Sequence, residues 1–202
     1  MKRSTLLRGA SVFAATAVLI AGCGRDDEST DDNSSDGSST DTGQFINPDT
    51  DCTDYQPTAG IDGDTIKIGT VRPASGPFAI YNTVTTGLEA YVKSVNDGGG
   101  VKAGDGKTYM LELVKEDDGY EPSRTPGVVK KLIDQEGIFA MVGQIGTSNN
   151  LAVRSTMNDG CIPSIGLATG STEWGNAADY PWYISGLPSY ATEARRFVEF
   201  LK

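Results

Sequence analysis

From residue 62 to residue 202, short apolar runs alternate with stretches in which apolar residues recur every three or four positions. The runs are rich in β-branched and aromatic residues and predict strands over 65–71, 109–114, 138–142, 162–167 and 182–184. The periodic stretches predict helices over 81–95, 122–136, 148–158 and 192–201.

This alternation is typical of an α/β fold with an open parallel sheet and helices on both faces, as in a Rossmann-like lobe. The run over 138–142 is apolar throughout, as expected of a strand that is buried on both faces. In such sheets ligands bind beside the carboxyl ends of the strands, where the strand order reverses. The loops that follow the strands are therefore the places where we expect functional residues.

Three of these loops, over 72–81, 143–150 and 168–175, are rich in small residues and hydroxyl groups. Thr147 or Ser148 stands where the N-cap of a helix is expected, so the start of that helix is a candidate site for a carboxylate. Ordinary helix capping explains each loop equally well when it is taken alone. Because the three loops converge on one edge of the predicted sheet, we expect a site for a small polar ligand there.

The sequence lacks the motifs of several common enzyme classes. It has no histidine, which excludes Ser-His-Asp and Cys-His nucleophiles and imidazole metal ligands. It has neither a Walker A sequence nor a G-x-G-x-x-G sequence after the first strand. Asp117 and Asp118 are a candidate metal or acid–base pair, although solvation or capping of their turn explains them better. Glu173 has no acid or base beside it, so we expect neither an enzyme nor a cofactor.

The formal net charge of −10 is concentrated in one segment. Residues 24–60 hold ten acidic residues against one arginine, whereas 61–202 hold 17 acidic and 13 basic residues. The acidic segment has almost no apolar residue before Phe45 and cannot bury enough surface to offset the entropy of ordering it. We therefore expect 23–60 to be a disordered tether and 61–202 to be the folded domain. The negative total also argues against nucleic acid as a partner.

The first 22 residues have the pattern of a targeting segment. Basic residues precede an apolar run over 10–21 that is too short to span a bilayer as a stable helix. The run ends in Ile20-Ala21-Gly22-Cys23, which resembles a bacterial lipobox. We therefore expect 1–22 to be a lipoprotein signal peptide and Cys23 to carry acyl chains on the extracytoplasmic face of the membrane. The alternative is an ordinary secretory signal with an incidental cysteine.

If Cys23 is acylated, Cys52 and Cys161 are the two remaining cysteines. An even pair in an oxidising compartment favours a disulfide, which would join the end of the tether to the domain. The alternative is two free thiols. The sequence has no C-x-x-C motif, so we expect no metal site and no redox catalysis at these residues.

Several short sequences between 62 and 202 occur in an order and spacing that are quite specific together. They are Ile66-Lys67-Ile68-Gly69, Ser75-Gly76-Pro77 with Tyr81, Val95-Asn96-Asp97-Gly98-Gly99-Gly100-Val101, Glu116-Asp117-Asp118-Gly119-Tyr120-Glu121-Pro122 and Val142-Gly143. In this the chain resembles the extracytoplasmic solute-binding proteins of ABC transporters, of the type that includes the leucine/isoleucine/valine-binding protein. The resemblance implies the type I periplasmic binding fold, in which two lobes close around a ligand.

The resemblance also implies a ligand site. In the family, the first lobe holds the carboxylate and ammonium of an amino acid through the loops after the third and fourth strands. The matching positions here are Thr147, Ser148, Ala168, Thr169 and Gly170. The family often has a hydroxyl where Gly170 stands, and Ser171 is next to it, so that contact stays open. Tyr81 matches an aromatic residue that lines the pocket, and Trp174 either adds a wall or packs within its own loop. The loop sequences lean toward the subgroup with varied ligands, including aromatic acids.

The chain corresponds to the first lobe of that fold. We expect it to be the N-terminal part of a longer receptor, with the second lobe absent. The alternative is a one-lobe protein that works in another way. A lone lobe would expose an apolar face of its sheet and would make only half of the ligand contacts.

Together these observations favour a membrane-anchored substrate-binding lipoprotein of an ABC importer. Its expected ligand is a small carboxylate-bearing solute, such as a branched-chain amino acid or an aromatic acid. The other expected partners are the transporter permease and, through the lipid anchor, the membrane. One alternative is a sensory or protein-interaction lipoprotein that uses a single lobe. Another is an α/β enzyme, against which the missing histidines and acid–base pair argue.

Overall fold

The computed structural model describes Cys52 and residues 58–202. The predicted signal peptide, Cys23 and most of the predicted tether lie outside these residues. The strands are β1 (Ile61–Asp62), β2 (Thr65–Arg72), β3 (Val101–Lys102), β4 (Thr108–Asp117), β5 (Ala140–Val142), β6 (Ser164–Leu167) and β7 (Tyr183–Ser185). The α-helices are α2 (Asn82–Asp97), α3 (Thr125–Asp134), α4 (Thr147–Leu151), α5 (Arg154–Asp159) and α6 (Tyr190–Phe200), and two 3-10 turns are η1 (Ala79–Tyr81) and η2 (Thr172–Gly175).

The strands form one sheet in the order β3-β4-β2-β5-β6-β7, with β1 beside β2. From β4 to β7 all neighbours are parallel, which confirms the predicted sheet. The chain passes from β2 to β4 on one side and then returns to β5 on the other, so the strand order reverses at β2. Ligands of open α/β sheets bind at such a reversal, outside the carboxyl ends of the strands.

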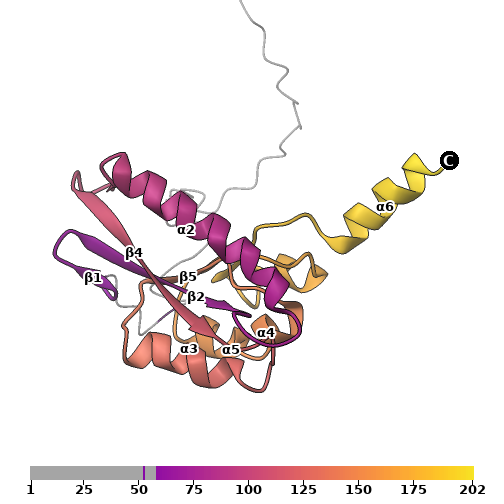
Figure 1. Ribbon diagram of the computed structural model, residues 1–202, viewed down its shortest axis with the longest axis horizontal. Helices are drawn as coiled ribbons and strands as arrows, with labels where there is room; N and C mark the ends of the chain where they lie inside the picture. Colours follow the sequence, from indigo (N-terminus) through magenta and orange to yellow (C-terminus); the bar gives the residue numbers. More distant parts are fainter. Residues whose placement is uncertain (1–51, 53–57) are drawn as a thin grey trace, which may run out of the picture. The chain divides into compact units, whose positions relative to one another are not determined.

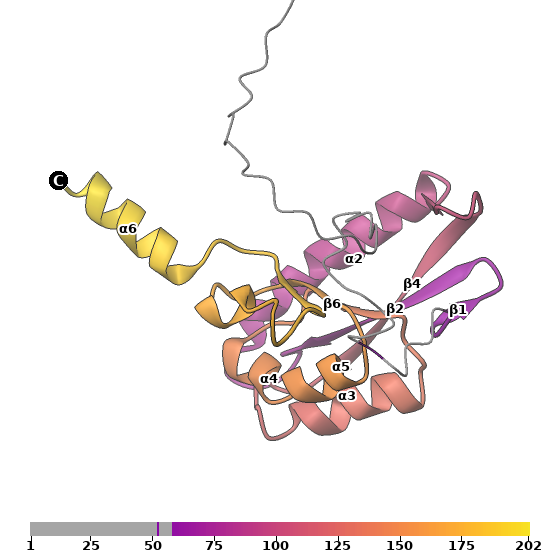
Figure 2. The same cartoon turned by 180° about the vertical axis from the view of Figure 1, so that it is seen from behind.

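Helices cover both faces of the sheet. Figures 1 and 2 show α2 on one face and α3, α4 and α5 on the other. The main core lies on the α3 side, where Leu132, Met141, Met157 and Leu167 are fully buried. A sheet that is covered on both faces explains why the predicted strand at 138–142 is apolar throughout.

The structure differs from the sequence prediction in three elements. β1 and β3 were not predicted, and they pair antiparallel with β2 and β4. Each is two residues long, which is too short for a hydrophobic period to show. The predicted helix over 148–158 is broken into α4 and α5, because Val153 leaves the helical conformation with φ −124° and ψ −2°.

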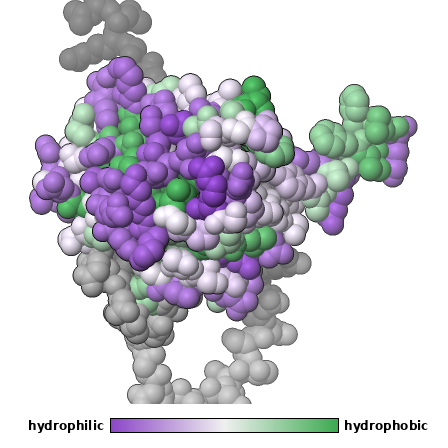
Figure 3. Space-filling model, turned by 60° about the horizontal axis from the view of Figure 1, so that its bottom comes forward, coloured by the Kyte–Doolittle hydropathy of each residue, from purple (hydrophilic) through white to green (hydrophobic). Residues whose placement is uncertain are grey.

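Some apolar surface is exposed on this lobe. Ile165 of β6 and Ile184 of β7 are paired neighbours and are both largely exposed. The helix α6 stands away from the sheet (Figures 1 and 2), and none of its eleven residues, all of them described, is buried. Figure 3 shows its apolar surface in green at the right of the molecule. Among the described residues, no helix has the length and apolar character that crossing a membrane requires.

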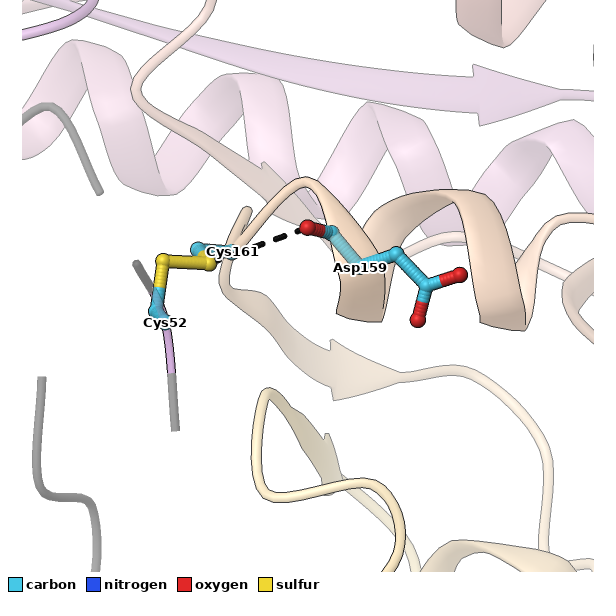
Figure 4. The surroundings of a disulfide bond; sticks show 3 residues. All are labelled: Cys52, Asp159 and Cys161. Carbon is cyan, nitrogen blue, oxygen red and sulfur yellow. Dashed lines mark hydrogen bonds between the residues drawn. A yellow bond between two sulfur atoms is a disulfide. The ribbon is translucent and has the colours of Figure 1, made fainter. Parts of the chain in front are cut away.

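A disulfide joins Cys52 to Cys161, with their Cα atoms 5.9 Å apart (Figure 4). Cys161 lies between α5 and β6, just before the amino end of β6. Both cysteines pack with Trp182 in a small buried cluster. The disulfide therefore attaches Cys52 at the edge of the sheet opposite to the carboxyl ends of the strands.

Candidate functional site

The loops after β5 and β6 lie side by side at the carboxyl edge of the sheet. Ile145 and Ala168 form an isolated parallel bridge beyond the ends of the two strands. The backbone N–H of Ala168 donates to the carbonyl of Gln144 at 3.0 Å. The parallel pairing thus continues into the loops and brings the hydroxyl residues that follow, Thr147 and Thr169, together.

The hydroxyl oxygens of Thr147 and Thr169 are 2.5 Å apart, although the residues are separated by 22 positions in the sequence. Thr169 is 1% exposed and Thr147 is half-buried. The hydroxyl of Tyr190, the first residue of α6, lies 3.5 Å from the Thr169 hydroxyl. Three hydroxyl groups from three different segments therefore gather at one point, which we call the hydroxyl cluster (Thr147, Thr169 and Tyr190).

The start of α4 differs from the sequence prediction. Its N-cap is Gly146, with φ 98° and ψ 131°, and not Thr147 or Ser148. The helix has only five residues, so the dipole that would attract a carboxylate is small. Ser148 is exposed, whereas the Thr147 side chain bonds to Thr169 instead of capping the helix. The predicted N-cap is therefore wrong, because Gly146 holds that position, whereas a carboxylate site at the start of this helix stays a prediction.

A buried carboxylate holds the neighbouring loops in position. Asp118 is 2% exposed and accepts hydrogen bonds from the Thr125 hydroxyl at 2.7 Å and from the Asn149 amide at 2.8 Å. It also accepts the backbone N–H of Tyr120 at 2.9 Å. Asp118 thus connects the loop after β4 with α3 and α4, and it fixes Tyr120 at a φ of 65°. A non-glycine residue in this conformation is held there by its surroundings.

The neighbouring Asp117 has a different set of partners. It accepts hydrogen bonds from the backbone N–H groups of Ala74 at 2.8 Å and of Gly119 at 2.9 Å. Asp117 therefore caps the turn, which is one of the two explanations that the sequence offers. Asp118 is buried, so it is not a solvated residue of that turn. In the part of the chain that the structure describes, no three His, Cys, Asp or Glu side chains are grouped in a way that could hold a metal ion.

Three aromatic rings pack together, and one of them, Tyr120, reaches the hydroxyl cluster. The ring of Tyr120 is 5.0 Å from that of Phe78 and 5.5 Å from that of Tyr81, measured between centroids. A Cβ atom at Gly146 would lie 2.9 Å from Cε2 of Tyr120, so the ring packs directly on this glycine beside Thr147. Burial raises the pKa of Tyr120, and the nearby phenols of Tyr81 and Tyr190 raise it further.

Tyr190 packs on a second glycine. A Cβ atom at Gly170 would lie 2.6 Å from Cδ1 of Tyr190, and the Tyr190 N–H donates to the Gly170 carbonyl at 2.6 Å. A hydrogen bond with the Thr169 hydroxyl lowers the pKa of Tyr190, with smaller contributions from the backbone of Gly170 and from Thr147. At this position the space that a longer side chain would need is filled by the tyrosine ring.

The structure brings most of the predicted site residues to one edge, and Trp174 is the exception. Ser171 follows Gly170 in the same loop, where it is the N-cap of η2 and accepts a hydrogen bond from the N–H of Glu173 at 3.3 Å. Trp174 is buried in the core, where its ring stacks on Tyr183 at 5.8 Å. Of the two alternatives for Trp174, packing is therefore the one that the structure supports, because a ring enclosed in the core cannot line the open edge.

Sequence reasoning missed Phe78, Tyr120 and Tyr190. Tyr120 belongs to one of the sequences that resemble the family, but nothing in that sequence shows its ring against Gly146. Tyr190 lies 21 positions after Thr169 and reaches the cluster only because the chain returns after β7. The glycine at 170 was the available signal, since a glycine often marks a place that another group approaches closely.

Comparison with known proteins gives a consistent result. Residues 65–202 match the periplasmic binding protein family. The Leu/Ile/Val-binding protein homolog 6 of Brucella abortus is 28% identical over 104 residues, which cover 50% of this chain and 25% of that protein. The chain therefore spans about a quarter of the length of the curated relatives that it matches.

Solved structures show the same similarity. A possible leucine/isoleucine/valine-binding protein from Rhodopirellula baltica superposes with a TM-score of 0.60 and 26% identity, over 69% of this chain and 36% of that one. The branched-chain amino acid transporter substrate binding protein LivJ from Streptococcus pneumoniae, in complex with isoleucine, gives a TM-score of 0.52 and 27% identity, over 62% of this chain and 34% of that one.

The parallel sheet with its reversal at β2 and the match over 65–202 agree on one conclusion. The chain belongs to the periplasmic binding protein family and forms part of a type I periplasmic binding lobe.

Proposed function

We propose that this chain is the first lobe of an extracytoplasmic solute receptor that serves an ABC importer. Its ligand is a small solute that carries a carboxylate, a branched-chain amino acid or an aromatic acid. The relatives named as Leu/Ile/Val-binding proteins, and the LivJ structure with isoleucine, support this class of ligand. The receptor binds its solute without chemical conversion and passes it to a permease.

The observation that carries the proposal is the pair of hydroxyls of Thr147 and Thr169, 2.5 Å apart at the carboxyl edge. Each hydroxyl rotates freely about its C–O bond, so both can turn from each other toward an incoming acceptor. Hydrogen bonds to a charged acceptor are about twice as strong as those between neutral groups. A carboxylate is therefore the partner that gains most at this point.

The surroundings of the pair fit a carboxylate with an apolar or aromatic remainder. Arg124, which is exposed and donates to the Asp117 carbonyl at 3.3 Å, adds positive charge at the same edge. Phe78 and Tyr81 are both 45% exposed and offer apolar surface around Tyr120. We also propose that acyl chains on Cys23 and the acidic tether hold the receptor at the membrane.

The test replaces each threonine by valine, which removes the hydroxyl and keeps the shape of the side chain. In the full-length protein, Thr147→Val and Thr169→Val should each weaken binding of the ligand at least tenfold, since a hydrogen bond to a charged group contributes about 1.5–3 kcal/mol. A panel of amino acids and aromatic acids, screened by thermal shift and measured by calorimetry, supplies the ligand.

Thr156→Val is the matched control, because Thr156 is exposed on α5 and lies outside the loops that follow the strands. It should leave the affinity unchanged. If no member of the panel stabilises the wild-type protein, the transport proposal is wrong. If a ligand binds and neither valine variant weakens it, the site lies elsewhere.

A further inference from the structure

Tyr190 has an unusual place between the sheet and the helix that leaves it. It is the first residue of α6, which follows the N-cap Ser189. Its ring lies against Gly170 and its hydroxyl faces Thr169, yet 53% of the residue is exposed. The side chain is therefore held mainly by the contact of its ring with Gly170 and of its hydroxyl with Thr169, and less by burial.

The hydrogen bonds of the hydroxyl cluster leave capacity unused. The three hydroxyls hold three O–H donors, and the cluster contains two mutual contacts, Thr147 with Thr169 and Thr169 with Tyr190. Two donors are enough to make both contacts, so a third donor is available. The contact between Thr169 and Tyr190 is 3.5 Å long, whereas a well-formed O–H···O bond is about 2.7–2.8 Å, so the phenol is only weakly engaged.

The lack of a side chain at Gly170 sets the position of the phenol. A Cβ atom there would lie 2.6 Å from the Tyr190 ring and 2.7 Å from the Pro188 carbonyl oxygen. Only glycine lets the ring come close enough for its hydroxyl to reach Thr169. The loop after β6 is therefore built to accept Tyr190.

We propose that Tyr190 is a ligand-contacting residue whose phenolic O–H donates to the carboxylate of the bound solute, beside the hydroxyls of Thr147 and Thr169. This inference rests on the proposed function, because it assigns a third donor to the same site. It places one ligand contact on α6, outside the loops of β5 and β6. Binding of the solute then ties the start of α6 to the sheet through the ligand as well as through Gly170.

The first test compares Tyr190→Phe with wild type in the full-length protein. The variant removes one hydroxyl and keeps the ring on Gly170, and because Tyr190 is half exposed the fold should be unaffected. Affinity for the best carboxylate of the panel should fall about tenfold, as expected for the loss of a hydrogen bond to a charged group. Tyr91→Phe is the matched control, since Tyr91 is exposed on α2, and it should bind as wild type does.

A second readout separates contact with the ligand from a purely structural role. A carboxylate beside the phenol disfavours the phenolate and raises the pKa of Tyr190. The difference in tyrosinate absorbance between wild type and Tyr190→Phe, recorded against pH with and without saturating ligand, should therefore shift to higher pH on binding. Glu193 and Tyr120 also interact electrostatically with this phenol. Both are present with and without ligand, so the shift on binding reports the ligand.

The outcomes distinguish the two proposals. A tenfold loss together with the absorbance shift supports the role of Tyr190. If wild type binds a panel carboxylate but Tyr190→Phe binds it equally well, or the absorbance does not shift, this inference is overturned and the proposed function stands. If wild type binds no member of the panel, both are overturned.

Discussion

At the scale of single residues, the core beneath the site gives the fold a dependence on pH. Tyr183 of β7 is buried against Trp174, and burial raises the pKa of its phenol to about 12. The native state therefore keeps a proton that the unfolded chain loses above its ordinary value of about 10. Because the pKa of Tyr183 is higher in the folded protein than in the unfolded chain, the protonated phenol contributes fully to the free energy of unfolding below pH 10. This contribution is lost as the pH rises toward 12.

We predict that the free energy of unfolding falls by about 2 kcal/mol between pH 10 and pH 12 through this residue alone. Urea denaturation at several pH values in this range measures the loss. Over this pH range Tyr183→Phe should lose about 2 kcal/mol less free energy of unfolding than wild type does. Tyr91→Phe, which changes an exposed tyrosine, should lose as much as wild type. Equal losses for wild type and Tyr183→Phe would contradict the prediction.

The sequence predicts the site in part, for reasons that differ from residue to residue. Thr147 and Thr169 follow strands, and strand ends meet at one edge of a parallel sheet, so their proximity can be deduced from the pattern. Trp174 cannot be placed in this way, because an aromatic residue in a loop can equally turn inward. Tyr190 depends on the path of the chain after β7 and on a close approach at Gly170, neither of which a local pattern contains.

At the scale of elements, the strand and helix pattern predicts the parallel sheet, and the exceptions are short. The long strands and α2, α3 and α6 have enough residues for a period to be recognised. β1 and β3 exist because turns fold them back onto β2 and β4, and turn geometry decides such short pairings. Asn149 and Asn150 lie in α4, ahead of the break, and are buried with hydrogen bonds to Asp118 and to the Gly146 carbonyl.

Two glycines of different elements give opposite predictions for the same substitution. Gly146 before α4 has φ 98°, and a Cβ atom there would lie 2.5 Å from Oδ1 of Asn149 and 2.9 Å from Tyr120. Gly87 lies inside α2, and a Cβ atom there meets nothing within 4 Å. Gly146→Ala should therefore destabilise the fold by about 1–3 kcal/mol through backbone strain. Gly87→Ala should stabilise it by about 0.5–1 kcal/mol through helix propensity.

Thermal and urea denaturation of the two variants test this pair. The order of stability should be Gly87→Ala above wild type and wild type above Gly146→Ala. A Gly146→Ala protein as stable as wild type would show that the turn before α4 does not need its left-handed conformation.

At the scale of the molecule, the disulfide restricts the unfolded chain and so stabilises the fold. It closes a loop with a sequence separation of 109 residues between Cys52 and Cys161. A loop of this length restricts the unfolded chain strongly, so the double variant Cys52→Ser/Cys161→Ser should lose about 2–5 kcal/mol of stability. Urea denaturation of the variant, and of wild type with and without reductant, measures this loss. Because the disulfide lies at the edge opposite to the hydroxyl cluster, ligand affinity below the unfolding transition should not change.

The same disulfide determines which part of the protein bears a mechanical force. A pull on the chain before Cys52 passes across the two sulfur atoms into the turn ahead of β6, and it bypasses β2, β4 and β5, which lie inside the covalent loop. With a separation of 109 residues at up to about 3.5 Å each, roughly 380 Å of contour length stays locked until the disulfide is reduced. The oxidised protein thus shields the strands that carry the site's first loops from tension along its own chain.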